Sequence, residues 1–235
     1  MTIKVLDTFA GAGGFSLGFK MAGYEIIGAI EQDEWACDTF KFNNSSAKVL
    51  KRDINALTDW DIKTEFCDLQ PDVILGGSPC QGFSVCNKNN GDPKDPRNSL
   101  FMDFIRIGRV LLPSIMILEN VPNIVKAQTK SNKKVIDIIV KELNYLGFYT
   151  YVDILDTASY GIPQLRKRLF IIASRKRLEN PFPQPTHKLF SNENILNMDL
   201  NNCPTLWDAI SDLPSIEARE GSEEMKYTLK PRSNY

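Results

Sequence analysis

The chain has 235 residues, of which 43% are hydrophobic and 24% are charged, and its formal net charge is −1. These values are ordinary for a globular protein with one sizeable domain, and no signal peptide or membrane-spanning apolar run occurs. We therefore expect a soluble cytoplasmic protein. The net charge gives no sign of nucleic-acid binding, but it does not exclude a local basic face.

The cysteine and histidine content argues against several kinds of site. The five cysteines are odd in number and form no Cys-x-x-Cys pair, and His187 is the only histidine. This composition disfavours a disulfide framework, a zinc site built from Cys and His, and Cys–His protease chemistry. We expect no metal ion.

Apolar runs and helical spacings alternate along the first three quarters of the chain. Strands are expected at residues 3–9, 24–30, 48–51, 72–75, 113–118, 148–155 and 168–173. Helices are expected at residues 15–22, 33–43, 100–111 and 135–146. This alternation predicts an α/β fold with a Rossmann-like, doubly wound and mainly parallel sheet, whose ligand crevice lies at the carboxyl edge of the strands.

The character of the sequence changes at about residue 179, where prolines and then Asn- and Ser-rich segments begin. We predict a catalytic and cofactor-binding domain at 1–178, followed by a connector at 179–235. Tryptophans are usually core anchors, and that is the expectation for Trp35, Trp60 and Trp207.

A glycine-rich turn and two acids predict a cofactor site. Gly11, Gly13 and Gly14 separate the first strand from the first helix, where a ligand can approach the backbone. Glu31 ends the second strand, where a carboxylate can accept both hydroxyls of a ribose, and Asp53 follows the third strand. With no basic residue near the glycines, these acids favour an adenosine ligand without phosphates, S-adenosylmethionine rather than NAD or ATP. Helix capping by the acids is the structural alternative.

A thiol, an acid and two guanidinium groups follow other strands of the same predicted edge. Cys80 lies in a turn after strand 72–75, and a thiolate there is a strong nucleophile. Glu119 follows the next strand, Arg166 precedes the last strand and Arg168 begins it. A thiolate can add to C6 of cytosine when an acid bonds N3, and C5 then attacks a sulfonium methyl group. We assign Glu119 as the acid and an arginine to the O2 side.

Four motifs in order carry a family resemblance. They are DTFAGAGG at 7–14, GSPCQGFS at 77–84, ENV at 119–121 and YGIPQLRKR at 160–168. Over about residues 3–175 the chain resembles a bacterial DNA (cytosine-5) methyltransferase. The resemblance implies a fold that binds S-adenosylmethionine, and it implies that the substrate is double-stranded DNA.

The resemblance implies a role for individual residues. Phe9 would pack on the adenine, Glu31 would bind the ribose and Asp53 the adenine amino group. Ile54, Pro79 and Leu100 would line the cofactor pocket. Cys80 would be the nucleophile, Glu119 would hold N3 and the amino edge of cytosine, and Arg168 would hold O2.

The polar segment after the nucleophile is implied to contact DNA. Residues 84–97 would form a mobile loop that closes over the duplex, and its Gly and Lys content fits that role. The contacts expected from it are Ser84, Lys88, Lys94 and Arg97. The target cytosine must leave the base stack, and phosphate contacts from this loop would offset part of the unfavourable free energy.

The chain departs from the family pattern after the connector. The family continues with a variable target-recognition region, a further Arg-containing motif and an Asn-Ser-Val segment, none of which is found before Tyr235. The chain is then expected to be either the catalytic subunit of a split restriction–modification methyltransferase, whose second subunit carries target recognition, or a truncated form. We expect no sequence-specific methylation from the isolated chain. An RNA cytosine methyltransferase and a catalytically silent binding homologue are the alternatives.

Overall fold

The computed structural model describes most of the chain. The described residues are 2–78, 100–128, 133–188, 200–227 and 229–230. They divide into two units: the first comprises Met1–Ile154 and Arg168–Phe182, and the second comprises Leu155–Lys167 and Pro183–Tyr235. No described helix is long and apolar enough to cross a membrane.

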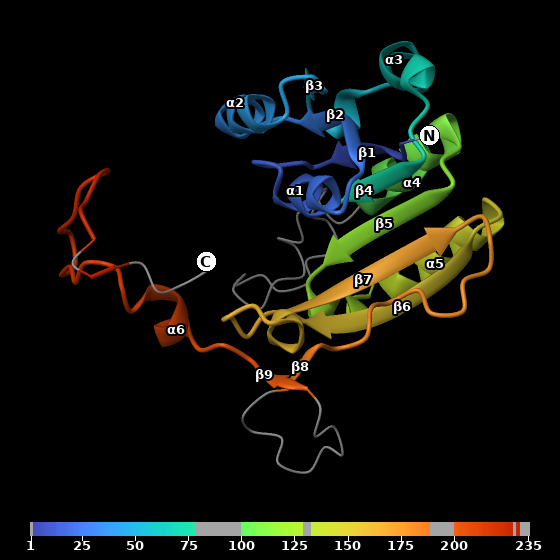
Figure 1. Ribbon diagram of the computed structural model, residues 1–235. Coiled ribbons are helices and arrows are strands. Elements are labelled where there is room, and N and C mark those ends of the chain that lie inside the picture. The colour runs from blue at the N-terminus through green and yellow to red at the C-terminus, as the bar shows by residue number, and fades with distance from the viewer. Residues whose placement is uncertain (1, 79–99, 129–132, 189–199, 228, 231–235) are drawn as a thin grey trace. The chain divides into compact units, whose positions relative to one another are not determined.

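A seven-stranded sheet forms the centre of the first unit, with strand order β3-β2-β1-β4-β5-β7-β6 (Figure 1). The strands are β1 (Lys4–Thr8), β2 (Glu25–Glu31), β3 (Lys48–Lys51), β4 (Val73–Gly76), β5 (Ile115–Asn120), β6 (Tyr149–Asp156) and β7 (Lys167–Ser174). The neighbouring pairs from β3 to β5 are parallel, and β7 is antiparallel to β5. The predicted Rossmann-like, mainly parallel sheet is thereby confirmed.

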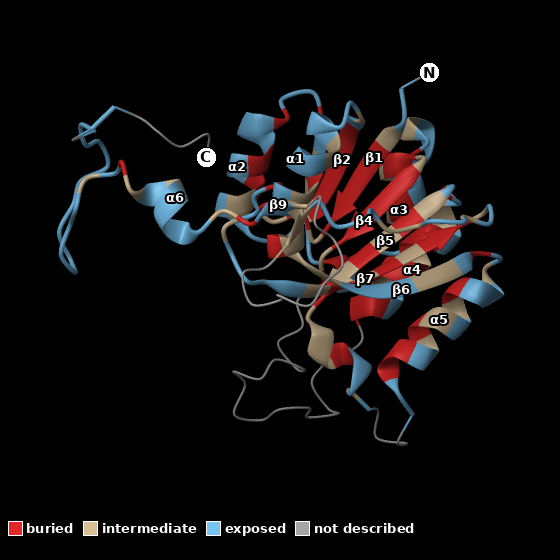
Figure 2. Cartoon of the chain, turned by 60° about the horizontal axis from the view of Figure 1, so that its bottom comes forward, coloured by how far each residue is buried: buried red, intermediate tan, exposed pale blue. Residues whose placement is uncertain are grey.

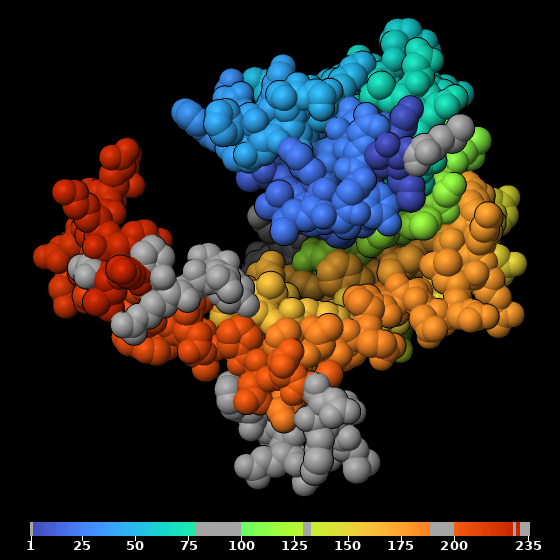
Figure 3. All heavy atoms as spheres, in the orientation of Figure 1, coloured from blue at the N-terminus to red at the C-terminus, as the bar shows by residue number. Residues whose placement is uncertain are grey.

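Helices cover both faces of this sheet. They are α1 (Gly14–Met21), α2 (Glu34–Asn43), α3 (Asp59–Phe66), α4 (Leu100–Leu111) and α5 (Val135–Tyr145). One apolar cluster joins the sheet to α3, α4 and α5, and a second joins it to α1 and α2. The space-filling view shows atoms of α1 and α2, in blue, at the surface of their face (Figure 3).

Alternation along the central strands explains why there are two clusters. Leu6 of β1 and Ile74 of β4 belong to the cluster with α4, whereas their neighbours Val5, Val73 and Leu75 belong to the cluster with α1. Successive side chains of a strand point to opposite faces, so a strand buried on both faces must be apolar throughout. Figure 2 shows these central strands as the most buried part of the unit.

The first unit differs from the sequence expectations in two respects. Helix α3 was not expected, although Thr58 and Asp61 form a capping box that marks its start. The core assignment of the tryptophans is wrong. Trp35 and Trp60 are 81% and 72% exposed, and Trp207 of the second unit is 72% exposed.

The described residues of the second unit contain little regular structure. Their elements are η5 (Thr157–Tyr160), β8 (His187–Lys188), β9 (Asn201–Asn202) and α6 (Leu206–Ile210). Strands β8 and β9 pair in parallel. Gly161 has a φ of +87°, and a Cβ there would lie 2.6 Å from His187 Cε1, so this turn requires glycine. The functional division at residue 178 stays a prediction.

Candidate active site

The turn after β1 has a backbone shape that few residues adopt. Phe9 has a φ of 57°, Gly11 a φ of 54° and Gly13 a φ of 93°. A positive φ is unusual for a bulky residue such as Phe9, and such strain is typical of functional sites. A Cβ on Gly13 would lie 2.9 Å from the Phe40 ring, whereas a Cβ on Gly11 or Gly14 would meet no atom within 4 Å. The turn therefore packs on α2 through Gly13 and faces open space at the other two glycines.

Glu31 is fixed at the carboxyl end of β2, beside this turn. Its Oε2 accepts a hydrogen bond from the Gly11 backbone N–H at 2.7 Å. Its Oε1 accepts from the backbone N–H groups of Gln32 and Asp33, at 2.8 and 2.9 Å. Three backbone donors thus set the orientation of the carboxylate and leave about one of its four lone-pair sites, on Oε2, open to a hydroxyl group. A carboxylate fixed in this way suits a hydroxyl of a ribose.

The start of α1 is open to a ligand. Gly13 is the N-cap, no side chain caps the helix, and no acidic residue lies in the first turn. The first N–H groups of a helix need acceptors, and they favour a negative or polar group. Together with the open space at Gly11 and Gly14, this helix start fits the polar end of a ligand whose ribose lies at Glu31.

The other predicted cofactor residues lie on the α4 side of the sheet. Asp53 caps the short helix η1 (Ile54–Ala56), with Oδ1 accepting from the Asn55 backbone N–H at 3.0 Å. Helix capping, the structural alternative to ligand binding, is therefore observed for Oδ1, one of the two carboxylate oxygens of Asp53. Ile54 and Leu100 are 4% and 6% exposed and belong to the same core cluster. They can offer a ligand only a small part of their surface.

Glu119 and Arg168 form an ion pair, with Arg168 Nε 2.9 Å from Glu119 Oε1. The antiparallel pairing of β5 and β7 sets Glu119 opposite Phe170 and Asn120 opposite Leu169, which brings the start of β7 to the end of β5. Their side chains are 26% and 22% exposed, so the pair remains accessible. Arg166 is exposed and belongs to the second unit.

Asn120 is a site residue to which the sequence analysis gave no role. Its Nδ2 donates to the carbonyl oxygen and hydroxyl of Ser78, at 3.4 and 3.3 Å, and its Oδ1 accepts from the Val121 backbone N–H at 2.8 Å. Asn120 and Ser78 are both buried. Since Ser78 lies two residues before Cys80, this amide tethers the start of the predicted catalytic loop to β5. Its place in the ENV motif is the signal that could have found it.

Replacing Asn120 with alanine is expected to lower the free energy of unfolding by about 1–3 kcal/mol, because it removes the partner of the buried Ser78 hydroxyl and of the part-buried Val121 backbone N–H. Chemical denaturation followed by circular dichroism measures this. The control is Asn144→Ala, since Asn144 is exposed and, among the described residues, its side chain bonds only the Thr150 hydroxyl. The control is expected to change stability by less than about 0.5 kcal/mol. Equal losses of unfolding free energy in Asn120→Ala and Asn144→Ala would show that Asn120 does not tether Ser78 to β5.

The remaining predicted residues lie outside the described residues. They are Pro79, Cys80, Ser84, Lys88, Lys94 and Arg97. The structure describes the supports on either side of this range, Ser78 two residues after β4 and Leu100 at the start of α4. Among the described residues, no group of three or more His, Cys, Asp or Glu side chains is placed to hold a metal ion.

Asp7 is a buried acid beneath the glycine-rich turn. Its Oδ2 accepts a hydrogen bond from the Ser16 hydroxyl of α1 at 2.6 Å, which ties β1 to the helix that follows the turn. Burial raises the pKa of Asp7 from 3.8 to about 6, and the Ser16 hydrogen bonds oppose part of that rise.

The raised pKa of Asp7 predicts a pH-dependent stability. Between pH 3.8 and about 6 the folded chain holds a proton that the unfolded chain has lost, so the Asp7 contribution falls as pH rises through this window and is level above it. Asp7→Asn removes this contribution. The unfolding free energy of the variant minus that of the wild type should therefore rise by about 2 kcal/mol from pH 4 to pH 7. Urea denaturation at several pH values measures it, and a difference that does not change with pH would contradict it.

Comparisons with known proteins are consistent with this arrangement. The model of the C-5 cytosine-specific DNA methylase family matches residues 3–233. The Type II methyltransferase M.DdeI of Desulfomicrobium norvegicum is 44% identical over 235 residues, which cover 99% of this chain and 54% of that protein. The Type II methyltransferase M.AquIA of a Picosynechococcus species is 34% identical, over 91% of this chain and 90% of that protein.

A solved structure has a similar fold. It is an E. coli protein described as a prophage-encoded DNA modification methyltransferase, with a TM-score of 0.71 and 28% sequence identity. The match covers 92% of this chain and 56% of that one. The chain thus spans about half the length of M.DdeI and of the solved protein, and nearly the full length of M.AquIA.

Proposed function

The chain belongs to the C-5 cytosine-specific DNA methylase family, and from this premise we propose that it supplies the catalytic centre for methylation of cytosine C5 in double-stranded DNA. The observation that carries the proposal is the accessible ion pair between Glu119 and Arg168. Strand β5, on which Glu119 lies, also holds Ser78 through the Asn120 amide. Ser78 lies two residues before Cys80, so β5 links the ion pair to the predicted nucleophile. The pair offers an acid and a cation to one cytosine edge. Methylation of bacterial DNA would place the protein in the cytoplasm.

The chemistry assigned to the chain is nucleophilic addition followed by elimination. The Cys80 thiolate forms a bond to C6 of a cytosine that has left the base stack. Glu119 stabilises the proton at N3 and contacts the amino edge, and Arg168 stabilises the negative charge that develops towards O2. Arg166 is the second guanidinium assigned to this region. The addition opens the C5–C6 double bond, and C5 takes the methyl group as its bond to the sulfonium sulfur breaks. C5 then loses its proton to water, the N3 proton returns to Glu119, the C6–sulfur bond breaks and the thiolate is regenerated.

We propose that the turn after β1, Glu31 at the end of β2 and Asp53 after β3 bind S-adenosylmethionine. This cofactor supplies an electrophilic methyl group when bound. The fixed carboxylate of Glu31 and the open space at Gly11 and Gly14 support this assignment. Phe9 would pack on the adenine, and Asp53 would accept from its amino group. The predicted pocket-lining residues Gly13, Ile54, Pro79 and Leu100 complete the site.

The range after Cys80 is proposed to contact the DNA backbone. Lys88, Lys94 and Arg97 would each bond a phosphate, and Ser84 would contact the duplex near the nucleophile. Binding should then weaken as the salt concentration rises.

A second polypeptide is proposed to carry target recognition. The chain matches 54% of M.DdeI, so that relative contains further regions. The second unit exposes a group of apolar side chains of the kind that protein partners cover: Leu206, Trp207, Ile210, Leu213, Ile216, Met225, Tyr227 and Leu229. These two observations support a partner that packs on residues 206–229.

The test measures transfer of tritiated methyl groups by the chain alone and by the chain mixed with the part of M.DdeI that it does not match. We expect 5-methylcytosine in hydrolysed DNA from the mixture, and no sequence-specific product from the chain alone. Preferred labelling of RNA would favour the RNA methyltransferase alternative. A mixture that binds S-adenosylmethionine but labels no nucleic acid would favour a silent binding homologue.

A further inference from the structure

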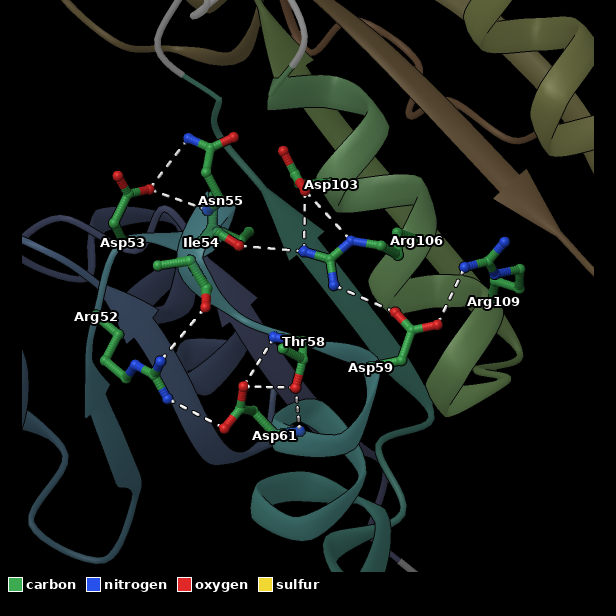
Figure 4. Close-up of polar contacts among 11 residues, drawn as sticks. Arg52, Asp53, Ile54, Asn55, Thr58, Asp59, Asp61, Asp103, Arg106 and Arg109 are labelled. Carbon is green, nitrogen blue, oxygen red and sulfur yellow. Dashed lines mark hydrogen bonds and ion pairs between the residues drawn. The ribbon is translucent and has the colours of Figure 1, made fainter.

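A polar network joins the segment after β3 to α4, with Arg106 at its centre (Figure 4). Arg106 Nη2 donates to the Ile54 carbonyl oxygen at 3.1 Å, and Nη1 donates to Asp59 Oδ1 at 3.2 Å. Nε and Nη2 also donate to Asp103 Oδ1, at 3.3 and 2.9 Å. One guanidinium group therefore holds a backbone carbonyl of η1, a carboxylate of α3 and a carboxylate of its own helix.

The bond to the Ile54 carbonyl is the part of this network that bears on the cofactor site. Ile54 immediately follows Asp53, whose Oδ1 accepts hydrogen bonds from the backbone and side-chain nitrogens of Asn55, so the three residues form one closed turn. The Ile54 side chain is buried in the same core cluster as Leu100 of α4. Helix α4 thus lies against both the side chain and the carbonyl of the residue after Asp53.

The other end of this turn is held independently of Arg106. Arg52 donates to the Ala56 carbonyl oxygen at 3.3 Å and to Asp61 Oδ1 at 3.2 Å. These bonds keep residues 52–61 as a folded segment, but they do not reach α4. Arg106 is the residue of the network that bonds both η1 and α3 from α4.

We propose that Arg106 is a positioning residue for the adenine end of the cofactor. It holds the turn of Asp53 against α4, so that Asp53 and Leu100, two of the residues assigned to the cofactor pocket, keep a fixed separation. This inference rests on the proposed function, in which Asp53 accepts from the adenine amino group. Arg106 lies six residues after Leu100, about 9 Å along the helix, and acts without touching the ligand.

Lysine cannot replace this arginine. The Arg106 side chain is 21% exposed and uses three different nitrogens for its bonds to Ile54, Asp59 and Asp103. A guanidinium presents its donors in a rigid planar fork, whereas an ammonium is a single point of charge. A lysine would keep the charge balance between the two carboxylates but would lose the bond to the carbonyl.

Arg109 provides a matched control one helical turn away. Its Nη2 donates to Asp59 Oδ2 at 3.1 Å, and its side chain is 58% exposed. Among the described residues its guanidinium bonds Asp59 alone. Arg109→Lys therefore alters a bond from the same helix to the same carboxylate, Asp59, and leaves the bond between Arg106 and η1 in place.

The experiment measures ligand affinity by isothermal titration calorimetry with two probes. S-Adenosylhomocysteine carries the adenine amino group, and S-inosylhomocysteine has a carbonyl oxygen in its place. We expect Arg106→Lys to weaken S-adenosylhomocysteine binding by about tenfold, the loss of one well-placed hydrogen bond. It should also reduce the preference for S-adenosylhomocysteine over S-inosylhomocysteine. Arg109→Lys should leave both affinities within about twofold of the wild type.

The outcomes separate this inference from the proposed function. A wild-type chain that binds neither probe contradicts the proposed function. If the wild type binds with a preference and Arg106→Lys keeps both its affinity and its preference, Arg106 has no positioning role. Equal weakening of both probes also overturns the inference, since it indicates a general structural effect. A thermal unfolding curve for each variant establishes that folded chains are compared.

Discussion

Replacing Cys80 with alanine is expected to lower methyl transfer to DNA by at least about a thousandfold, while S-adenosylmethionine affinity stays within about twofold of the wild type. The variant keeps the sheet edge that holds Glu119 and Arg168, but it lacks the atom that bonds C6. Without this bond C5 of cytosine is too weak a nucleophile to accept a methyl group. The rate is measured with tritiated methyl donor and the chain combined with the unmatched part of M.DdeI.

Cys86 provides the control for this experiment, because it lies six residues after Cys80 in the sequence and is predicted to be a spare thiol of the polar segment. Cys86→Ala should retain the rate within about threefold. DNA that contains 5-fluorocytosine adds a direct readout, since the fluorine at C5 blocks the final elimination and leaves the protein attached. An adduct is expected with the wild type and with Cys86→Ala but not with Cys80→Ala. An adduct that forms without Cys80 would refute its role.

The sheet could be predicted from the sequence because its central strands β1, β2 and β4 are buried on both faces. Runs such as Val73–Gly76 and Ile115–Asn120 contain little besides apolar residues, and helical spacings separate them. Strand ends shifted by one or two residues, as in β5, which ends at Asn120 and was expected to end at residue 118. Such shifts follow from capping and hydrogen bonding, which an apolar pattern does not specify.

Helix periodicity explains the error about the tryptophans. Helix α2 buries Cys37 and Phe40, three residues apart on one face, whereas Trp35 is exposed. At about 100° per residue, Trp35 lies on the opposite side of the helix from that pair. Trp60 has the same relation to Ile62 in α3. The general tendency of tryptophan to be buried predicted core positions for Trp35 and Trp60, whereas the helical period correctly predicts that both are exposed.

Long-range contacts within the candidate site could be predicted only in part. The edge rule for parallel sheets places Glu31 near the glycine-rich turn, and the hydrogen bond to Gly11 agrees with it. The ion pair between Glu119 and Arg168 depends on β7 running antiparallel to β5, which the sequence pattern does not reveal. The contacts of Asn120 with Ser78 and of Arg106 with Ile54 are likewise specific to the folded chain.

Replacing Glu119 with glutamine is expected to lower methyl transfer by about 100- to 10,000-fold, because an amide cannot supply the proton that stabilises N3 during addition. Arg168→Leu should also slow transfer. Since Arg168 Nε is bonded to Glu119 Oε1 before any substrate binds, the two losses should combine to less than their product.

Glu65→Gln is the matched control, because Glu65 forms a surface ion pair with Lys48 and should leave the rate unchanged. Single-turnover rates of the two variants and the double variant measure this coupling. Fully multiplicative losses would mean that Glu119 and Arg168 act on cytosine independently, whereas a coupled loss indicates that one ion pair holds both the acid and the guanidinium against the base.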